Sequence, residues 1–110
     1  PLGAADLDGD GKMEIAYIDR PHLAKTLRIW RYENQNLTEV AVQPGYSNHK
    51  IGWPFIAGGI RQCGTGPEMI LSTGNWARVM AVELKNGQLA ARDLGPYAGP
   101  DSLSNALNCG

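Results

Sequence analysis

The chain has 110 residues and a formal net charge of −1, from 10 basic and 11 acidic side chains. A balance this even gives no strong field that would attract nucleic acid or an anionic membrane. The residues include no signal peptide and no apolar run long enough for a membrane-spanning helix. We therefore expect no nucleic-acid partner and no membrane insertion, at a length compatible with one domain.

The first feature in chain order is an acidic loop over residues 6–14. Aspartates recur at every second position and a glycine follows the third, which is the spacing of a calcium loop. Calcium takes six to eight oxygen ligands, and the glycine allows the sharp turn between them. The expected ligands are three aspartates, one backbone carbonyl and a final carboxylate: Asp6, Asp8, Asp10, Lys12 and Glu14.

The flanks of this loop argue against a helix-loop-helix calcium hand. Such a loop needs a bidentate glutamate at position 12, where this chain has Tyr17. Residues 14–18 are apolar and rich in strand formers, so the loop is expected to join two strands. The alternative is an ordinary acidic hairpin, because Asp and Gly are also good turn formers.

A strand-borne loop of the pattern D-x-D-x-D-G-x-x-[DE], followed by an apolar strand, resembles the FG-GAP/VCBS repeats of integrin-like β-propellers. The resemblance covers residues 5–15, with Glu14 in place of the family's commoner Asp. It implies that each repeat forms a four-stranded antiparallel blade, with Ca²⁺ in the hairpin between the first two strands. The Lys12 carbonyl and the carboxylates named above would be the ligands.

A weak internal repeat supports this interpretation. Residues 27–32 and 36–39 match residues 79–84 and 88–91 at an offset of 52, and residues 14–16 match 68–70 at an offset of 54. A period near 50 suits a four-stranded blade. In the second unit the three aspartates are replaced by Ile60, Gln62 and Gly64, and only Glu68 remains. The sequence therefore predicts one calcium site.

The predicted fold class is all-β, with about two four-stranded antiparallel blades of a larger or oligomer-completed propeller. Expected strands cover residues 14–18, 26–32, 37–42, 55–60, 68–73, 79–84 and 89–94, with one helical turn near 102–107. The expected units are a blade with a truncated first strand at 1–43, a linker at 44–54, a degenerate blade at 55–95 and a tail at 96–110. Propellers close with roughly four to eight blades, so we expect a fragment or a self-associating chain.

The two cysteines, Cys63 and Cys109, are 46 residues apart (109 minus 63). A disulfide would tie the tail to the degenerate loop and contribute roughly 4 kcal/mol by loop entropy alone. The alternative is two free thiols, as in an intracellular chain. A weak calcium loop belongs where calcium is abundant, so we expect an extracellular, cell-surface or periplasmic location and a disulfide.

No nucleophile elbow, Cys-His signature or phosphate-binding glycine loop is present, and His22 and His49 are expected in loops, so we expect no enzyme activity. The leading hypothesis is a non-catalytic calcium-binding module for extracellular binding or adhesion of a protein or glycan. One alternative is a carbohydrate-binding propeller in which Trp76 and Arg78 hold a sugar, against a packing role for Trp76. The other is a non-catalytic fragment of a secreted hydrolase.

Overall fold

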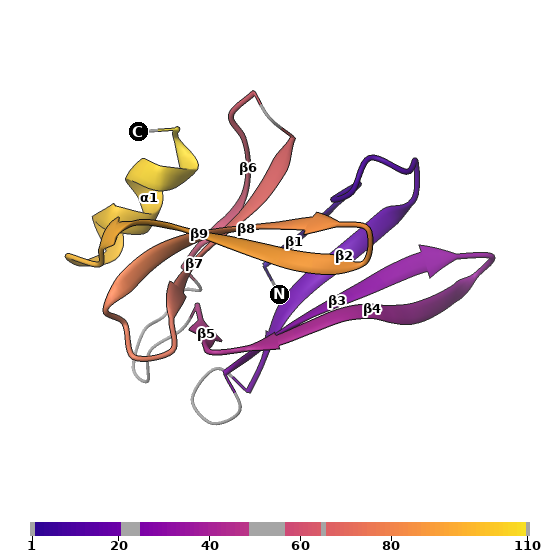
Figure 1. Cartoon of the computed structure of the whole chain (residues 1–110), viewed down its shortest axis with the longest axis horizontal. Helices are drawn as coiled ribbons and strands as arrows, with labels where there is room; N and C mark the ends of the chain where they lie inside the picture. The colour runs from indigo at the N-terminus through magenta and orange to yellow at the C-terminus, as the bar shows by residue number, and fades with distance from the viewer. Residues whose placement is uncertain (1, 21–24, 49–56, 65, 110) are drawn as a thin grey trace.

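A computed structural model describes residues 2–20, 25–48, 57–64 and 66–109, which form two antiparallel sheets and one helix (Figure 1). The first sheet contains β1 (Gly3–Ala5), β2 (Met13–Asp19), β3 (Thr26–Glu33) and β4 (Asn36–Pro44). The second contains β5 (Tyr46–Ser47), β6 (Gly59–Gln62), β7 (Pro67–Thr73), β8 (Arg78–Lys85) and β9 (Gln88–Pro96), and α1 (Pro100–Leu107) follows. The expected β-rich fold with a short C-terminal helical segment is confirmed, whereas the propeller remains a prediction.

The first sheet is a meander in the order β1-β2-β3-β4. The tight turn between β3 and β4 is formed by Asn34 and Gln35, whose φ angles are 52° and 64°. Two consecutive residues with positive φ give the turn twist that matches a two-stranded antiparallel ribbon. Asn86 and Gly87, with φ of 52° and 75°, make the corresponding turn between β8 and β9.

The second sheet has five strands but is only four strands wide. One edge of β7 pairs with β8, and the other edge is shared by β6 and β5, which pair with different parts of β7. Tyr46 and Ser47, inside the segment expected as a linker, therefore form a strand, while residues 49–54 lie outside the described residues. The strand expected at 55–60 is found at Gly59–Gln62, because Gly58 turns the chain with a φ of 87°. Residues 55 and 56, like His22 and His49, lie outside the described part.

The strand registers confirm the internal repeat. In the first sheet Ile15 lies opposite Trp30, and in the second Met69 lies opposite Val82, at the offsets of 54 and 52 expected from the sequence. The next strand agrees, because Leu37 faces Tyr32 as Leu89 faces Leu84. The cross-strand pairs of the first sheet thus recur in the second sheet at the offsets of the repeat.

The sheets pack face to face around one apolar core. Its buried residues come from both sheets and from the acidic loop: Leu7, Ala16, Ile18, Leu27, Ile29, Tyr46, Met69, Leu71, Val82 and Leu84. The approach is close near β1, where a Cβ added to Gly3 would lie 2.9 Å from the Ile60 side chain. A second core forms where Leu103 and Ala106 of α1 cover Ile70 on the opposite face of the second sheet (Figure 1).

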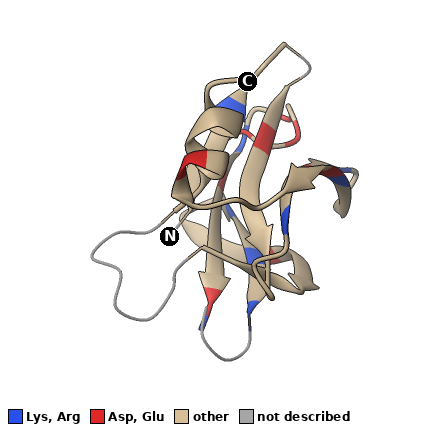
Figure 2. Ribbon diagram, turned by 90° about the vertical axis from the view of Figure 1, so that its left-hand side faces the viewer, with Lys and Arg blue, Asp and Glu red and all other residues tan. Residues whose placement is uncertain are grey.

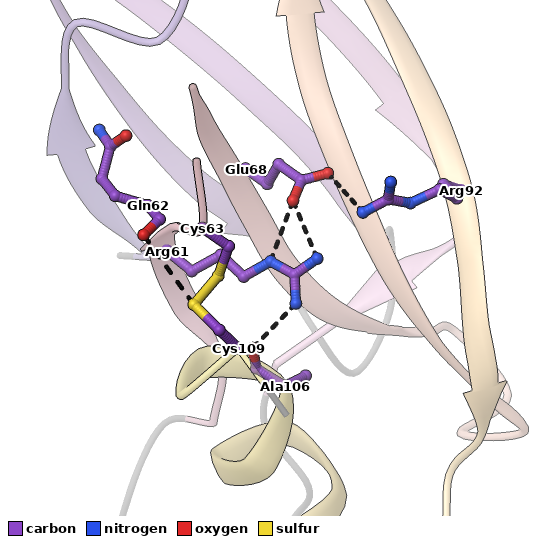
Figure 3. Close-up of a disulfide and its surroundings, with 7 residues drawn as sticks. All are labelled: Arg61, Gln62, Cys63, Glu68, Arg92, Ala106 and Cys109. Atoms are coloured by element: carbon purple, nitrogen blue, oxygen red, sulfur yellow. Dashed lines mark hydrogen bonds and ion pairs between the residues drawn. A yellow bond between two sulfur atoms is a disulfide. The ribbon is translucent and has the colours of Figure 1, made fainter. Parts of the chain in front are cut away.

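Basic and acidic residues are interspersed over the ribbon in Figure 2, as the near-neutral net charge suggests. The helix of the described residues, α1, is not long and apolar enough to span a bilayer. Cys63 and Cys109 form the expected disulfide, which ties the end of α1 to the turn after β6 (Figure 3). Disulfides persist in oxidising compartments.

Candidate metal centre

The acidic loop connects β1 to β2 and is folded around the carboxylate of Asp6. Its Oδ1 accepts hydrogen bonds from the N–H groups of Gly9 at 2.9 Å and Asp10 at 3.1 Å, and its Oδ2 accepts one from Gly11 at 2.8 Å. Gly9 and Gly11 have φ of 76° and 86°, a region that is costly for other residues. The regular placement of Asp and Gly thus produces a closed loop with its carboxylates turned inward.

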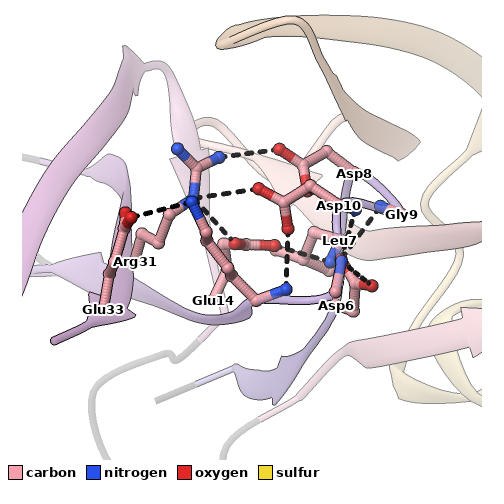
Figure 4. Close-up of polar contacts among 10 residues, drawn as sticks. Asp6, Leu7, Asp8, Gly9, Asp10, Glu14, Arg31 and Glu33 are labelled. Carbon is pink, nitrogen blue, oxygen red and sulfur yellow. Dashed lines mark hydrogen bonds and ion pairs between the residues drawn. The ribbon is translucent and has the colours of Figure 1, made fainter.

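Four carboxylates converge inside this loop (Figure 4): Asp6, Asp8, Asp10 and Glu14. Each offers an oxygen within 4.8 Å of the oxygens of the others. Ligands on opposite sides of one calcium ion, at 2.3–2.6 Å each, are separated by about 5 Å. The spacing of the four oxygens is therefore compatible with one ion touching all of them, and the cluster could hold a metal ion.

The loop is anchored to the core between the two sheets by Leu7. Its side chain is only 3% exposed and packs with the buried residues of both sheets. Its backbone N–H donates to Glu14 Oε1 at 2.8 Å, and Glu14 is fully buried. The conformation of the acidic loop and the packing of the sheets are thus coupled through Leu7, by its side chain in the core and by its N–H on Glu14.

A basic side chain reaches the acidic cluster from β3. Arg31 lies opposite Glu14 in the sheet and donates to Glu14 Oε2 at 3.0 Å and to Asp8 Oδ2 at 2.7 Å. Its Nε also lies 3.5 Å from Asp10 Oδ2. Each carboxylate oxygen has two lone pairs, so Arg31 can orient Asp8 and Glu14 without using all of their ligand capacity.

The local electrostatics favour the charged forms of Asp10 and Arg31. The hydrogen bond from the Lys12 N–H, at 2.8 Å, is the main cause that lowers the pKa of Asp10, and Arg31 lowers it further. The hydrogen bond to Glu14 is the main cause that raises the pKa of Arg31. Asp10 is therefore ionised and Arg31 protonated at neutral pH, and a single arginine faces four carboxylates.

Lys12 contributes to the loop through its backbone. Its side chain forms an ion pair with Glu33, Nζ to Oε1 at 2.8 Å, and this pair raises the pKa of Lys12. The ammonium is thus held by a residue of β3 outside the cluster. The carbonyl oxygen of Lys12 remains the group that the predicted ligand set assigns to the metal.

In the second sheet the counterpart of Glu14 is Glu68, and its charge is compensated by arginines alone. Glu68 is 3% exposed and bonds to Arg61 at 2.9 Å and to Arg92 at 2.9 Å (Figure 3). Arg61 also donates to the carbonyl of Ala106 in α1 at 2.9 Å. Two guanidinium groups therefore neutralise Glu68, the one acidic residue of the loop pattern that the second unit retains.

Sequence reasoning missed the basic partners of both glutamates. Arg31 lies on the same face of β3 as Leu27 and Ile29, but its pairing with Glu14 depends on the register between β2 and β3. Arg92 reaches Glu68 from β9, and no local spacing connects them. Leu7 was also missed, although an apolar residue inside an acidic loop is a signal for an anchor.

The proposed sugar-binding pair makes contacts within the chain. The Trp76 ring packs edge-on against Tyr97, with ring centroids 5.0 Å apart, beside the core under α1. Arg78 forms an ion pair with Asp93 at 2.9 Å, and this pair is the main cause that raises the pKa of Arg78. These contacts favour the packing role of Trp76 over sugar stacking.

A scan against protein-family models, a search of the curated proteins and a search of the solved structures each gave no match to this chain. The FG-GAP/VCBS resemblance therefore stays a prediction, and the geometry of the acidic loop is what supports a function.

Proposed function

We propose that this chain is a calcium-stabilised, non-catalytic β-repeat module of an extracellular or periplasmic protein that serves binding or adhesion. The observation that carries the proposal is the convergence of the four carboxylates of the acidic loop, with ligand oxygens within 4.8 Å of one another. Hard oxygen ligands in this number and spacing suit calcium better than a transition metal.

Charge balance supports a divalent cation. Asp6, Asp8, Asp10 and Glu14 carry four negative charges, and Arg31 supplies one positive charge. A calcium ion would reduce the remaining three charges to one. Glu14 is fully buried and shares Arg31 with Asp8, so a nearby cation would add to the compensation of its charge.

The role of the ion would be structural. Binding would hold the loop closed on Asp6, and the closed loop places Leu7 in the core between the sheets. Calcium would thus stabilise the contact between two units rather than serve as a sensor. The disulfide and a loop without a bidentate glutamate at position 12 favour a calcium-rich, oxidising environment.

Calorimetric titration with calcium tests this proposal. We expect binding of one equivalent, and loss of that binding in Asp6→Asn, because the amide removes a charge from the centre of the loop. Asp93→Asn is the matched control, since Asp93 is exposed and pairs with Arg78 away from the loop. Heat of binding that is unchanged in Asp6→Asn would refute the assignment of the ion to this loop.

A further inference from the structure

The two sheets contact each other through non-equivalent faces. The packing face of the first sheet carries small and branched side chains: Ala16, Ile18, Leu27 and Ile29. It lies on a receiving face of the second sheet: Met69, Leu71, Val82 and Leu84. Because these are opposite faces of equivalent units, the contact is heterologous and could be repeated.

The first sheet has a receiving face of its own. At the offsets of 54 and 52, the counterparts of the four receiving residues are Ile15, Tyr17, Trp30 and Tyr32. Tyr32 is 50% exposed, and the neighbouring Leu37 is 54% exposed. Nothing in the described part of the chain packs on this face as the first sheet packs on the second.

The exposed face is suited to an apolar partner. Ile15, Tyr17, Trp30 and Leu37 line a shallow depression on it. The Trp30 Nε1–H donates to the Tyr17 hydroxyl at 3.2 Å, so this pair meets part of its hydrogen-bonding capacity internally. On the same face Arg28 lies opposite Tyr17 and forms ion pairs with Asp19 and Glu39. An apolar depression with polar residues at its border is typical of an interaction surface.

The edge of the same sheet supplies a second, independent observation. In the second sheet, β5 pairs with Ser72 and Thr73 beyond the end of β6. β5 follows β4 directly in sequence, so the preceding unit provides it. The counterparts of Ser72 and Thr73 are Ile18 and Asp19, and β1 pairs only with residues 14–16. No strand among the described residues fills the β1 side of β2 at positions 18 and 19.

We infer that the exposed face of the first sheet and the open edge of β2 form a docking site for a further β-sheet repeat of the same kind. The partner would present a packing face of small and branched aliphatic side chains. It would also supply a two-residue strand to Ile18 and Asp19, arriving from the N-terminal side as the first unit does for the second.

The stack is closed at its other end. The packing face of the second sheet, at Ile70, Val79 and Ala81, is covered by Leu103 and Ala106 of α1. The disulfide between Cys63 and Cys109 ties α1 down. A cover of this kind acts as a terminal cap of a repeat array.

The cap also decides against a second copy as the head-to-tail partner. Within the described residues, the packing face of the first sheet is occupied by the second sheet and that of the second sheet by α1. A second copy has no packing face to offer unless α1 is displaced. A separate repeat unit is therefore the partner that the geometry fits.

The test is a fusion in which residues 2–110 are preceded by a copy of residues 1–57, with residue 57 of the copy joined directly to Leu2. This junction keeps the natural spacing, since Gly3 and Gly59 pair at equivalent positions. We expect hydrogen exchange of residues 17–19 in the original chain to slow by about tenfold or more. We also expect iodide quenching of Trp30 fluorescence to fall, measured as the difference from a Trp30→Phe variant.

The controls separate docking from loss of folding. Leu37→Asp in the original unit, at a 54% exposed position whose counterpart Leu89 packs against the core between the sheets, should abolish the added protection in the fusion, yet leave the melting temperature of the unfused chain nearly unchanged. Ala90→Asp, at an exposed position of β9, should leave the protection in place. Unchanged exchange and quenching would overturn the inference, as would an added unit that stays unfolded. Concentration-dependent dimerisation of the unfused chain that protects Trp30 would instead assign the face to a second copy.

Discussion

Glu14 and Glu68 occupy the same position in the two sheets, and each is buried, but different cations surround them. Glu14 shares Arg31 with the aspartates of the acidic loop, whereas Glu68 is bonded to both Arg61 and Arg92. A buried carboxylate needs a compensating partner because an uncompensated charge in the interior is costly. The second unit meets this need with side chains, and we propose that the first unit meets it with calcium.

Removal of Arg31 should make the protein more dependent on calcium. Arg31→Gln leaves Glu14 without its ion pair, so in a chelator we expect a loss of unfolding free energy of about 3 kcal/mol. Added calcium should recover most of this loss, since it compensates the same carboxylates. Denaturant unfolding with and without calcium measures both values.

The matched control for this substitution is Arg78→Gln. Arg78 and Asp93 form an exposed pair, and pairs of this kind contribute little to stability. We expect a small change that is the same with and without calcium. A calcium effect on Arg31→Gln no larger than on the natural chain would contradict the proposed role of Arg31.

Leu7 should be the residue through which the loop stabilises the sheets. Leu7→Ala removes a side chain that is 3% exposed in the inter-sheet core, and we expect a loss of about 2–5 kcal/mol. Leu37→Ala, at 54% exposure, is the control and should cost less than about 0.5 kcal/mol. Similar midpoints for the two variants in urea would show that the loop is not anchored in the core.

Reduction of the disulfide should destabilise the chain. Cys63 and Cys109 are 46 residues apart, and loop-closure entropy gives a loss of about 4 kcal/mol. The double variant Cys63→Ser, Cys109→Ser should have the same stability as the reduced protein, and its stability should not respond to reductant. Mass measurement after alkylation identifies the bridge, and two alkylated thiols in the unreduced protein would rule it out.

Asp19 should contribute stability at neutral pH that is lost in acid. Hydrogen bonds from Arg20 and then Arg28 lower the pKa of Asp19 in the folded state. A lowered pKa gives stability that is present above the unfolded-state value of about 3.9 and lost as the pH falls through the folded-state value. Asp19→Asn should therefore lower the melting temperature at pH 7, and the difference should shrink below about pH 4. A constant difference across this range would exclude the ionic contribution.

The acidic loop could be predicted because its ligand set is encoded in local spacing. The alternation of aspartates and the glycine at Gly11 are sufficient to turn the carboxylates of Asp6 and Asp10 toward one another. The paired strands of each unit could also be predicted from the sequence, since their alternation and the turns at Asn34 and Asn86 are local signals.

The remaining features depend on contacts between distant residues. β5 has only two residues, and its strand character comes from the free edge of β7 rather than from its own pattern. Arg92 meets Glu68 across the second sheet, 24 positions apart in sequence. The cover that α1 provides depends on the disulfide and on Ile70 beneath it. Periodicity and spacing carry no information about such pairings.

The most direct test of the central claim is thermal melting of the natural chain and of Asp6→Asn in calcium and in a chelator. With an extracellular-type affinity, about 10 mM free calcium should stabilise the natural chain by about 1.5–3 kcal/mol. That corresponds to a rise in melting temperature of about 6–13 °C, with little or no rise in Asp6→Asn. Equal melting temperatures of the natural chain in calcium and in chelator would contradict the account.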